Sequence, residues 1–124
     1  MKNVFLVVSL ALFSNFAISQ NIMSFKGDYS LYNINGDNVS KDIASTVFIT
    51  PFESNRFVIR GINWVGIGVI NENKGYYDWR FDDGKTGQTT FTINSDGSFI
   101  GKVLGYSTDP YSQGLDWVYK AIKK

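Results

Sequence analysis

Apolar and polar residues alternate most regularly near the middle of the chain. Residues 64–70, WVGIGVI, and residues 75–81, GYYDWRF, stand on either side of a short polar turn. In the second segment large rings recur at every other position, so Trp79 falls on one face and Arg80 on the other. Because side chains alternate across a β-strand, this pattern predicts a hairpin with one buried and one exposed face.

Similar alternation elsewhere, with turn residues between the segments, predicts eight strands. The Asn-Gly pair at 35–36 and the Asp-Gly pair at 96–97 are strong turn signals, because these residues adopt positive φ at little cost. Pro51 has no N–H for a ladder, so we expect an edge or a bulge there. Residues 40–43 fit a loop or one helical turn. The predicted strands are residues 25–34, 44–52, 56–62, 64–70, 75–81, 88–94, 98–106 and 115–122.

Eight short strands with short connections predict an all-β domain. We expect an antiparallel up-and-down meander that closes into a small barrel, because closure removes the edges along which sheets aggregate. In that arrangement the last strand pairs with the first, around Tyr29 and Leu31. A two-sheet β-sandwich built from the same strands is the alternative.

The first nineteen residues have the pattern of a secretory signal peptide. Lys2 precedes an apolar run over residues 4–13 that is too short to span a bilayer comfortably. Ala17-Ile18-Ser19 provides small residues before a cleavage site at Gln20. We therefore expect a single domain over residues 20–124 in a secreted or periplasmic protein. A retained N-terminal anchor is the alternative.

Composition narrows the classes of function. The chain has 12 basic and 11 acidic residues, and Lys2 leaves with the signal peptide, so the mature domain has no net charge. That balance gives no support for a nucleic-acid partner or a strongly anionic membrane. The chain has no Cys and no His, which removes disulfides, His-based metal sites and the usual nucleophilic catalysis. We predict no enzyme activity, no catalytic residue and no cofactor, although a carboxylate pair remains chemically conceivable.

Two oxygen-rich turns and one sequon have simple interpretations. Residues 82–84 and 94–97 contain ligands of the kind that calcium prefers, but they lack the length and the closing Glu of an EF-hand. We interpret both as ordinary turns and predict no metal site. Asn38-Val39-Ser40 is a glycosylation sequon, which matters only in a source that glycosylates secreted proteins.

The number and spacing of the strands resemble those of small secreted calycin-type barrels, the lipocalin-like and avidin-like proteins. Lipocalins open with Gly-x-Trp after an apolar residue, and residues 25–29, FKGDY, have this glycine with Tyr29 at the Trp position. Residues 108–111, TDPY, are similar to the Thr-Asp-Tyr of a later lipocalin loop, with one residue interposed. The length fits the avidin-like barrels better. The resemblance implies a barrel that binds something in or at its interior, without specifying the ligand.

Large rings at inward positions form the candidate site. An eight-stranded barrel is just wide enough to be filled by side chains or to hold one small ligand. So many rings favour a filled core, whereas Gly101 and Gly105 on the inward face favour open space. The predicted ligand-binding residues are Tyr29, Tyr77, Trp79, Trp117 and Tyr119.

Two functions stay open at this point. The first is a secreted, non-enzymatic barrel whose partner is a small apolar or aromatic ligand. The second is a secreted protein-interaction module with a solid aromatic core, which acts through its surface. No membrane span and no nucleic-acid partner is predicted for either.

The signal peptide gives a direct prediction. Because small residues at positions 17 and 19 follow the apolar run, mass spectrometry of secreted material should find a mature chain that begins at Gln20. Secreted protein that retains Met1 would contradict this.

Overall fold

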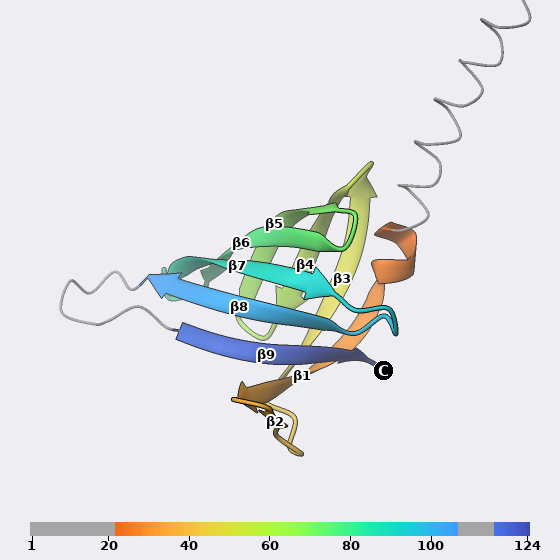
Figure 1. The fold of residues 1–124 in the computed structure, drawn as a ribbon. Coiled ribbons are helices and arrows are strands. Elements are labelled where there is room, and N and C mark those ends of the chain that lie inside the picture. The colour runs from red at the N-terminus through yellow and green to blue at the C-terminus, as the bar shows by residue number, and fades with distance from the viewer. Residues whose placement is uncertain (1–21, 107–115) are drawn as a thin grey trace, which may run out of the picture.

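The computed structural model describes residues 22–106 and 116–124. Within these residues nine strands form one antiparallel sheet that curls around a common interior (Figure 1). The predicted signal peptide and the residues 108–111 lie outside the described residues. The strands are β1 (Gly27–Asn35), β2 (Asn38–Val39), β3 (Ser45–Glu53), β4 (Arg56–Gly61), β5 (Trp64–Asn71), β6 (Lys74–Phe81), β7 (Thr86–Ile93), β8 (Phe99–Tyr106) and β9 (Asp116–Lys123).

The sheet closes because β1 pairs on both sides. Leu31 lies opposite Ser45 of β3 and opposite Ala121 of β9. The other strands follow in chain order from β3 to β9, so the predicted closed meander is confirmed and the sandwich is excluded. The short strand β2 pairs only with the end of β1 and lies outside the barrel (Figure 1).

Most predicted strands agree with the observed bounds to within two residues, and two segments differ. Phe25 is helical rather than extended, within a single turn that spans residues 22–25. Gly27 follows with a φ of 143°, which side chains rarely allow, and it lets the chain change direction into β1. The second difference is β2, since the turn at 35–38 continues into a two-residue ladder. Residues 40–43 form a loop, and the register shifts after Pro51 as expected.

The described part of the chain contains no helix with the length and hydropathy of a membrane span.

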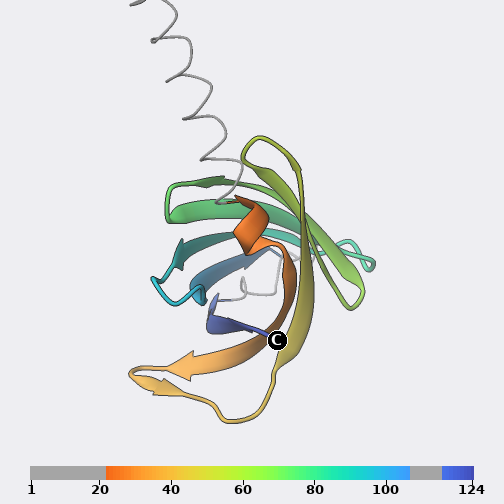
Figure 2. The same cartoon turned by 90° about the vertical axis from the view of Figure 1, so that its right-hand side faces the viewer.

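The helical turn closes one end of the barrel, across the opening that faces the viewer in Figure 2. Its side chains Ile22 and Phe25 are buried in the core. The Tyr29 hydroxyl donates a hydrogen bond of 2.7 Å to the Phe25 carbonyl, and Lys123 Nζ donates one of 3.0 Å to the Ser24 carbonyl. The turn is therefore attached to both the first and the last strand.

Aromatic rings fill the half of the barrel beneath the turn. The Phe25 ring lies within 5.8 Å, centroid to centroid, of four other rings. Two of these pairs meet edge to face, which is a favourable geometry for aromatic quadrupoles. The four rings belong to Tyr29, Phe57, Phe91 and Phe99.

The opposite facing of Trp79 and Arg80 agrees with the sequence pattern. The Trp79 side chain is buried and Arg80 is exposed. The same holds on β4, where Phe57 and Ile59 point inward and Arg60 points outward. The period of two residues therefore predicts the inward face of these strands correctly.

Replacing Phe25 with Ala should destabilise the fold by about 3–5 kcal/mol, because it leaves a cavity among packed rings. Met23 provides the control, since it belongs to the same turn and is 56% exposed. Met23→Ala should change stability by less than about 0.5 kcal/mol. The measurement is the denaturant midpoint of each variant, and equal midpoints would show that the turn does not belong to the core.

Candidate functional site

The half of the barrel away from the helical turn contains a cavity of about 160 Å³. Its wall consists of side chains from β1, β3 and β5 to β9, together with exposed Ile62 in the turn between β4 and β5. Trp64, Trp79 and Trp117, which are the three tryptophans of the chain, all line it. The sequence left open whether the interior is filled by side chains or has space for a ligand. Both hold here, because rings fill one half of the barrel and leave space in the other.

Four of the five predicted ligand-binding residues line the cavity, namely Tyr77, Trp79, Trp117 and Tyr119. Tyr29 is the exception. Its ring packs on Phe99 in the filled half, and its hydroxyl is engaged by the Phe25 carbonyl.

Sequence reasoning missed several residues of the wall. Trp64 and Phe81 are half-buried and pack against the core from the cavity side. Thr89 is fully buried and lies directly opposite Tyr77 in the sheet. Each of them has the parity of an inward position on its strand, so the alternation contained the signal. The predicted set contained only tyrosines and tryptophans and none from β5 or β7, so it left out Trp64, Phe81 and Thr89.

Glycines determine where the large rings lie. The Trp79 indole packs on the backbone of Gly87, its cross-strand partner, where a Cβ atom would collide with the ring. The Tyr119 ring packs on Gly101 in the same way. The sequence suggested that Gly101 leaves open space, but its role is to let a ring approach the wall of the barrel.

Two tyrosine hydroxyls meet in the middle of the barrel. The oxygens of Tyr77 and Tyr119 are 2.6 Å apart and share a buried hydrogen bond, although the residues are 42 positions apart. Burial raises the pKa of Tyr77 to about 12, against smaller opposite effects of Thr89 and Tyr119. Burial, together with the neighbouring Tyr77, raises the pKa of Tyr119 well above its ordinary value. Both side chains are therefore neutral near neutral pH.

Other polar groups around the cavity differ in how they are satisfied. Trp117 Nε1 donates to Asn33 Oδ1. Trp79 Nε1 and Thr89 Oγ1, by contrast, are buried with no hydrogen-bond partner among the described residues. The Thr89 hydroxyl lies close enough to Tyr77 to influence its pKa, but the two do not reach hydrogen-bond geometry. A buried polar group without a hydrogen-bond partner costs free energy, so these two atoms destabilise the folded protein.

In the two acidic turns, Asp96 and Asp83 bind groups of the same turn. Asp96 accepts hydrogen bonds from the backbone N–H and the hydroxyl of Ser98, and these bonds lower the pKa of Asp96. Asp83 accepts a hydrogen bond from the Lys85 N–H and forms an exposed ion pair with its ammonium. Across the described residues no group of three His, Cys, Asp or Glu side chains could hold a metal ion.

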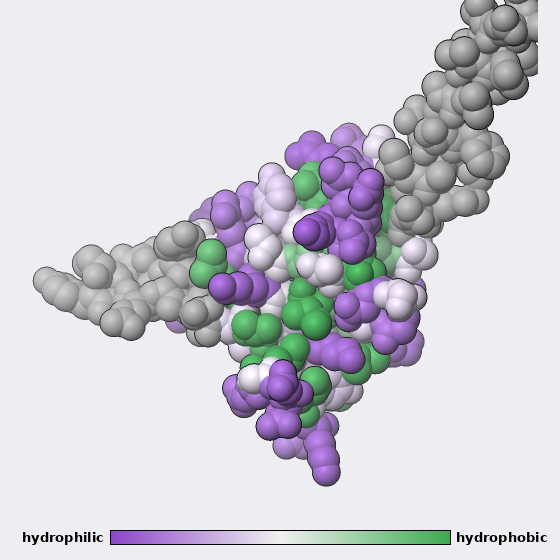
Figure 3. All heavy atoms as spheres, viewed as in Figure 1, coloured by the Kyte–Doolittle hydropathy of each residue, from purple (hydrophilic) through white to green (hydrophobic). Residues whose placement is uncertain are grey.

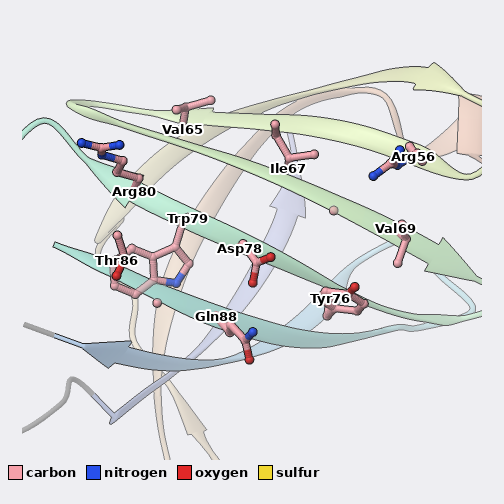
Figure 4. Close-up of a pocket in the computed structure, with 12 residues that line it drawn as sticks. Arg56, Val65, Ile67, Val69, Tyr76, Asp78, Trp79, Arg80, Thr86 and Gln88 are labelled. Carbon is pink, nitrogen blue, oxygen red and sulfur yellow. The ribbon is translucent and has the colours of Figure 1, made fainter. Parts of the chain in front are cut away.

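A second hollow lies on the outside of the barrel, over β4 to β7 (Figure 4). Figure 4 shows Arg56 and Arg80 at its two ends, with Ile67 and Asp78 between them. Ile67 is 52% exposed and Tyr76 is 46% exposed. The lining of this outer groove mixes apolar and charged side chains, whereas the lining of the interior cavity contains no charged side chain among the described residues.

The neighbouring face of the barrel has scattered apolar residues. In Figure 3 apolar side chains lie among hydrophilic ones there. On β8 and β9 the exposed apolar residues include Ile100, Leu104 and Ile122, and exposed Lys102 lies between the first two on β8. Single apolar residues of this kind are normal on a protein surface.

Comparison with protein-family models, with curated proteins and with solved structures finds no match for this chain. The likeness to calycin-type barrels is therefore a likeness of architecture, based on eight antiparallel strands closed into a barrel.

The tyrosine pair predicts a loss of stability in alkali. At a pH above the ordinary tyrosine pKa of 10.0, the unfolded chain loses protons that folded Tyr77 retains until about pH 12. The folded state then binds more protons than the unfolded state, so the free energy of unfolding falls as pH rises. Urea midpoints between about pH 8 and about pH 11 should fall less steeply in the variant Tyr77→Phe/Tyr119→Phe than in the native protein.

Tyr76→Phe is the control for this experiment, because Tyr76 is 46% exposed. It should keep the native pH dependence. If the double variant and the native protein follow the same curve, the buried pair does not control alkaline stability.

Proposed function

We propose that this protein is a secreted, non-enzymatic β-barrel that binds one small apolar or aromatic ligand in its interior cavity. The observation that supports this proposal is the cavity of about 160 Å³ beside a half of the barrel that is tightly filled. Protein interiors normally pack without voids of this size. A ligand bound there would remove apolar surface of the lining rings from water, which contributes roughly 25 cal/mol per Å².

The size and lining of the cavity limit the ligand. A cavity of about 150 Å³ with apolar walls is known to accept benzene, so this one matches a single ring. Rings of Trp64, Trp79 and Trp117 offer surfaces for stacking and edge-to-face contacts. Secretion is part of the proposal on the basis of the predicted signal peptide.

A titration with ethylbenzene tests this proposal, using the fluorescence of the tryptophans around the cavity. Val103 is buried and lines the cavity, while its neighbour Leu104 is 44% exposed. Val103→Phe should fill the space and abolish the saturable change, and Leu104→Phe should preserve it. Ser45→Leu is a second filling variant, should Val103→Phe fail to fold as judged by circular dichroism.

The proposal is wrong if the native protein gives no saturable response, or if folded filling variants respond as the native protein does.

A protein contact at the outer groove is the second candidate function. Arginine and tyrosine are enriched at protein interfaces, and Arg56, Arg80 and Tyr76 line this groove around exposed Ile67. Filling the interior leaves this surface unchanged. A biological activity that survives Val103→Phe would therefore favour the surface over the cavity.

A further inference from the structure

The three arginines of the chain gather on one side of the barrel. Arg56 and Arg60 belong to β4 and Arg80 to β6, and all three side chains are exposed. We call the outward side of β4 to β6 the arginine face. Arg56 lies over the Phe52 ring, 5.9 Å from its centre, and none of the three arginines forms an ion pair with a described residue. Their charges are therefore available to a partner.

The register of the sheet determines where the arginines lie around β5. Arg60 and Arg80 stand on either side of Val65, because each of them pairs with it. Arg56 pairs with Val69, four residues further along the same strand. At the usual spacings of a sheet, Arg60 and Arg80 are about 10 Å apart across β5, and Arg56 lies about 13 Å further along the strands.

An apolar strip lies between the arginines. Val65, Ile67 and Val69 are the outward side chains of this part of β5, and Figure 4 shows them in one row. Arg80 lies near one end of that row and Arg56 near the other (Figure 4). Ile67, at the centre, is 52% exposed. A partner that covers the strip therefore needs an apolar group between two groups that can bind arginine.

The balance of charge on the arginine face favours an anionic partner. Its outward positions hold three arginines and Lys74 but a single carboxylate, that of Asp78. A planar guanidinium can bind a carboxylate through two parallel hydrogen bonds, which lysine cannot do, and arginine is enriched at protein interfaces. Carboxylates are therefore the groups that this face is best equipped to bind.

An extended peptide has the repeat that these positions require. Its side chains at positions i, i+2 and i+4 leave the same face and span about 13 Å. A carboxylate at position i would lie between Arg60 and Arg80, and one at i+4 would lie beside Arg56. The side chain at i+2 would cover Ile67, where the neighbouring Asp78 repels an acidic residue.

We propose that the arginine face docks an extended segment of a partner protein with the pattern acidic-x-apolar-x-acidic. The inference gives a partner to the surface contact that is the second candidate function and rests on that contact, whereas it is independent of ligand binding in the interior cavity. A sulfated polysaccharide is the competing partner. It also offers anions to arginine, but it has no aliphatic side chain to cover Ile67.

An NMR titration of the ¹⁵N-labelled protein with the capped peptide Ser-Glu-Thr-Leu-Thr-Glu-Ser tests this proposal. The amide signals of Val65, Ile67 and Val69 should shift and saturate, while those of β8 and β9 stay in place. Two control peptides have Lys in place of both Glu residues, or Asp in place of Leu. Each should bind at least about tenfold more weakly, because it loses the ion pairs or places a carboxylate beside Asp78.

Arginine variants test the same contact from the side of the protein. Arg56→Gln, Arg60→Gln and Arg80→Gln should each raise the Kd of the acidic peptide by about twofold to about fivefold, which corresponds to the loss of one exposed ion pair. Lys102→Gln is the control, because Lys102 is an exposed cation on β8, outside the arginine face. It should leave the Kd unchanged.

The outcomes separate this proposal from the others. The docking is wrong if the acidic peptide gives no saturable shift, or if the arginine variants bind it as the native protein does. Arginine-dependent shifts with dextran sulfate but none with the peptide would assign the face to a polyanion and overturn the proposal. Shifts of the same amides on concentrating the protein alone would assign it to a second copy of this chain, with the same consequence. The ethylbenzene titration reports on the cavity separately, so either proposal can fail while the other stands.

Discussion

The pairing between β1 and β9 is the interaction on which the rest of the structure depends. Every other ladder of the barrel joins strands that follow one another, whereas this one joins the two ends of the meander. Its loop-closure entropy is recovered only when all the intervening strands are in place. The hydrogen bond from Trp117 to Asn33 crosses the same seam between residues 84 positions apart, and the Lys123 ammonium joins it to the helical turn.

Closure creates an interior that this sequence divides into two parts. The rings around Phe25 fill the first part, and the helical turn covers them. The second part keeps its rings against the wall, because Gly87 and Gly101 allow Trp79 and Tyr119 to lie on the backbone. The same residue types thus produce a solid core at one end and a cavity at the other.

Hydrogen bonding follows the same division. In the filled half the buried Tyr29 hydroxyl has a backbone acceptor. Around the cavity, Tyr77 and Tyr119 satisfy each other, but Trp79 Nε1 and Thr89 Oγ1 do not find partners among the described residues. Natural proteins tend to break packing and hydrogen-bonding rules where they function. Residues with unsatisfied polar atoms therefore lie beside the empty volume, and one of them, Trp79, also borders the outer groove.

The sequence by itself determined the strands and their facing, because alternation is a local property with a period of two residues. It therefore placed Trp79 inward and Arg80 outward, and it located four of the aromatic residues that line the cavity. The helical turn around Phe25 was not predicted, because Gly27 at the start of β1 has a positive φ and alternation does not reveal the resulting change of direction. Only the tertiary structure decided that Tyr29 belongs to the filled half, that Tyr77 meets Tyr119, and that Thr89 is left unsatisfied. These contacts join residues from distant strands, and their geometry exists only after the barrel has closed around them.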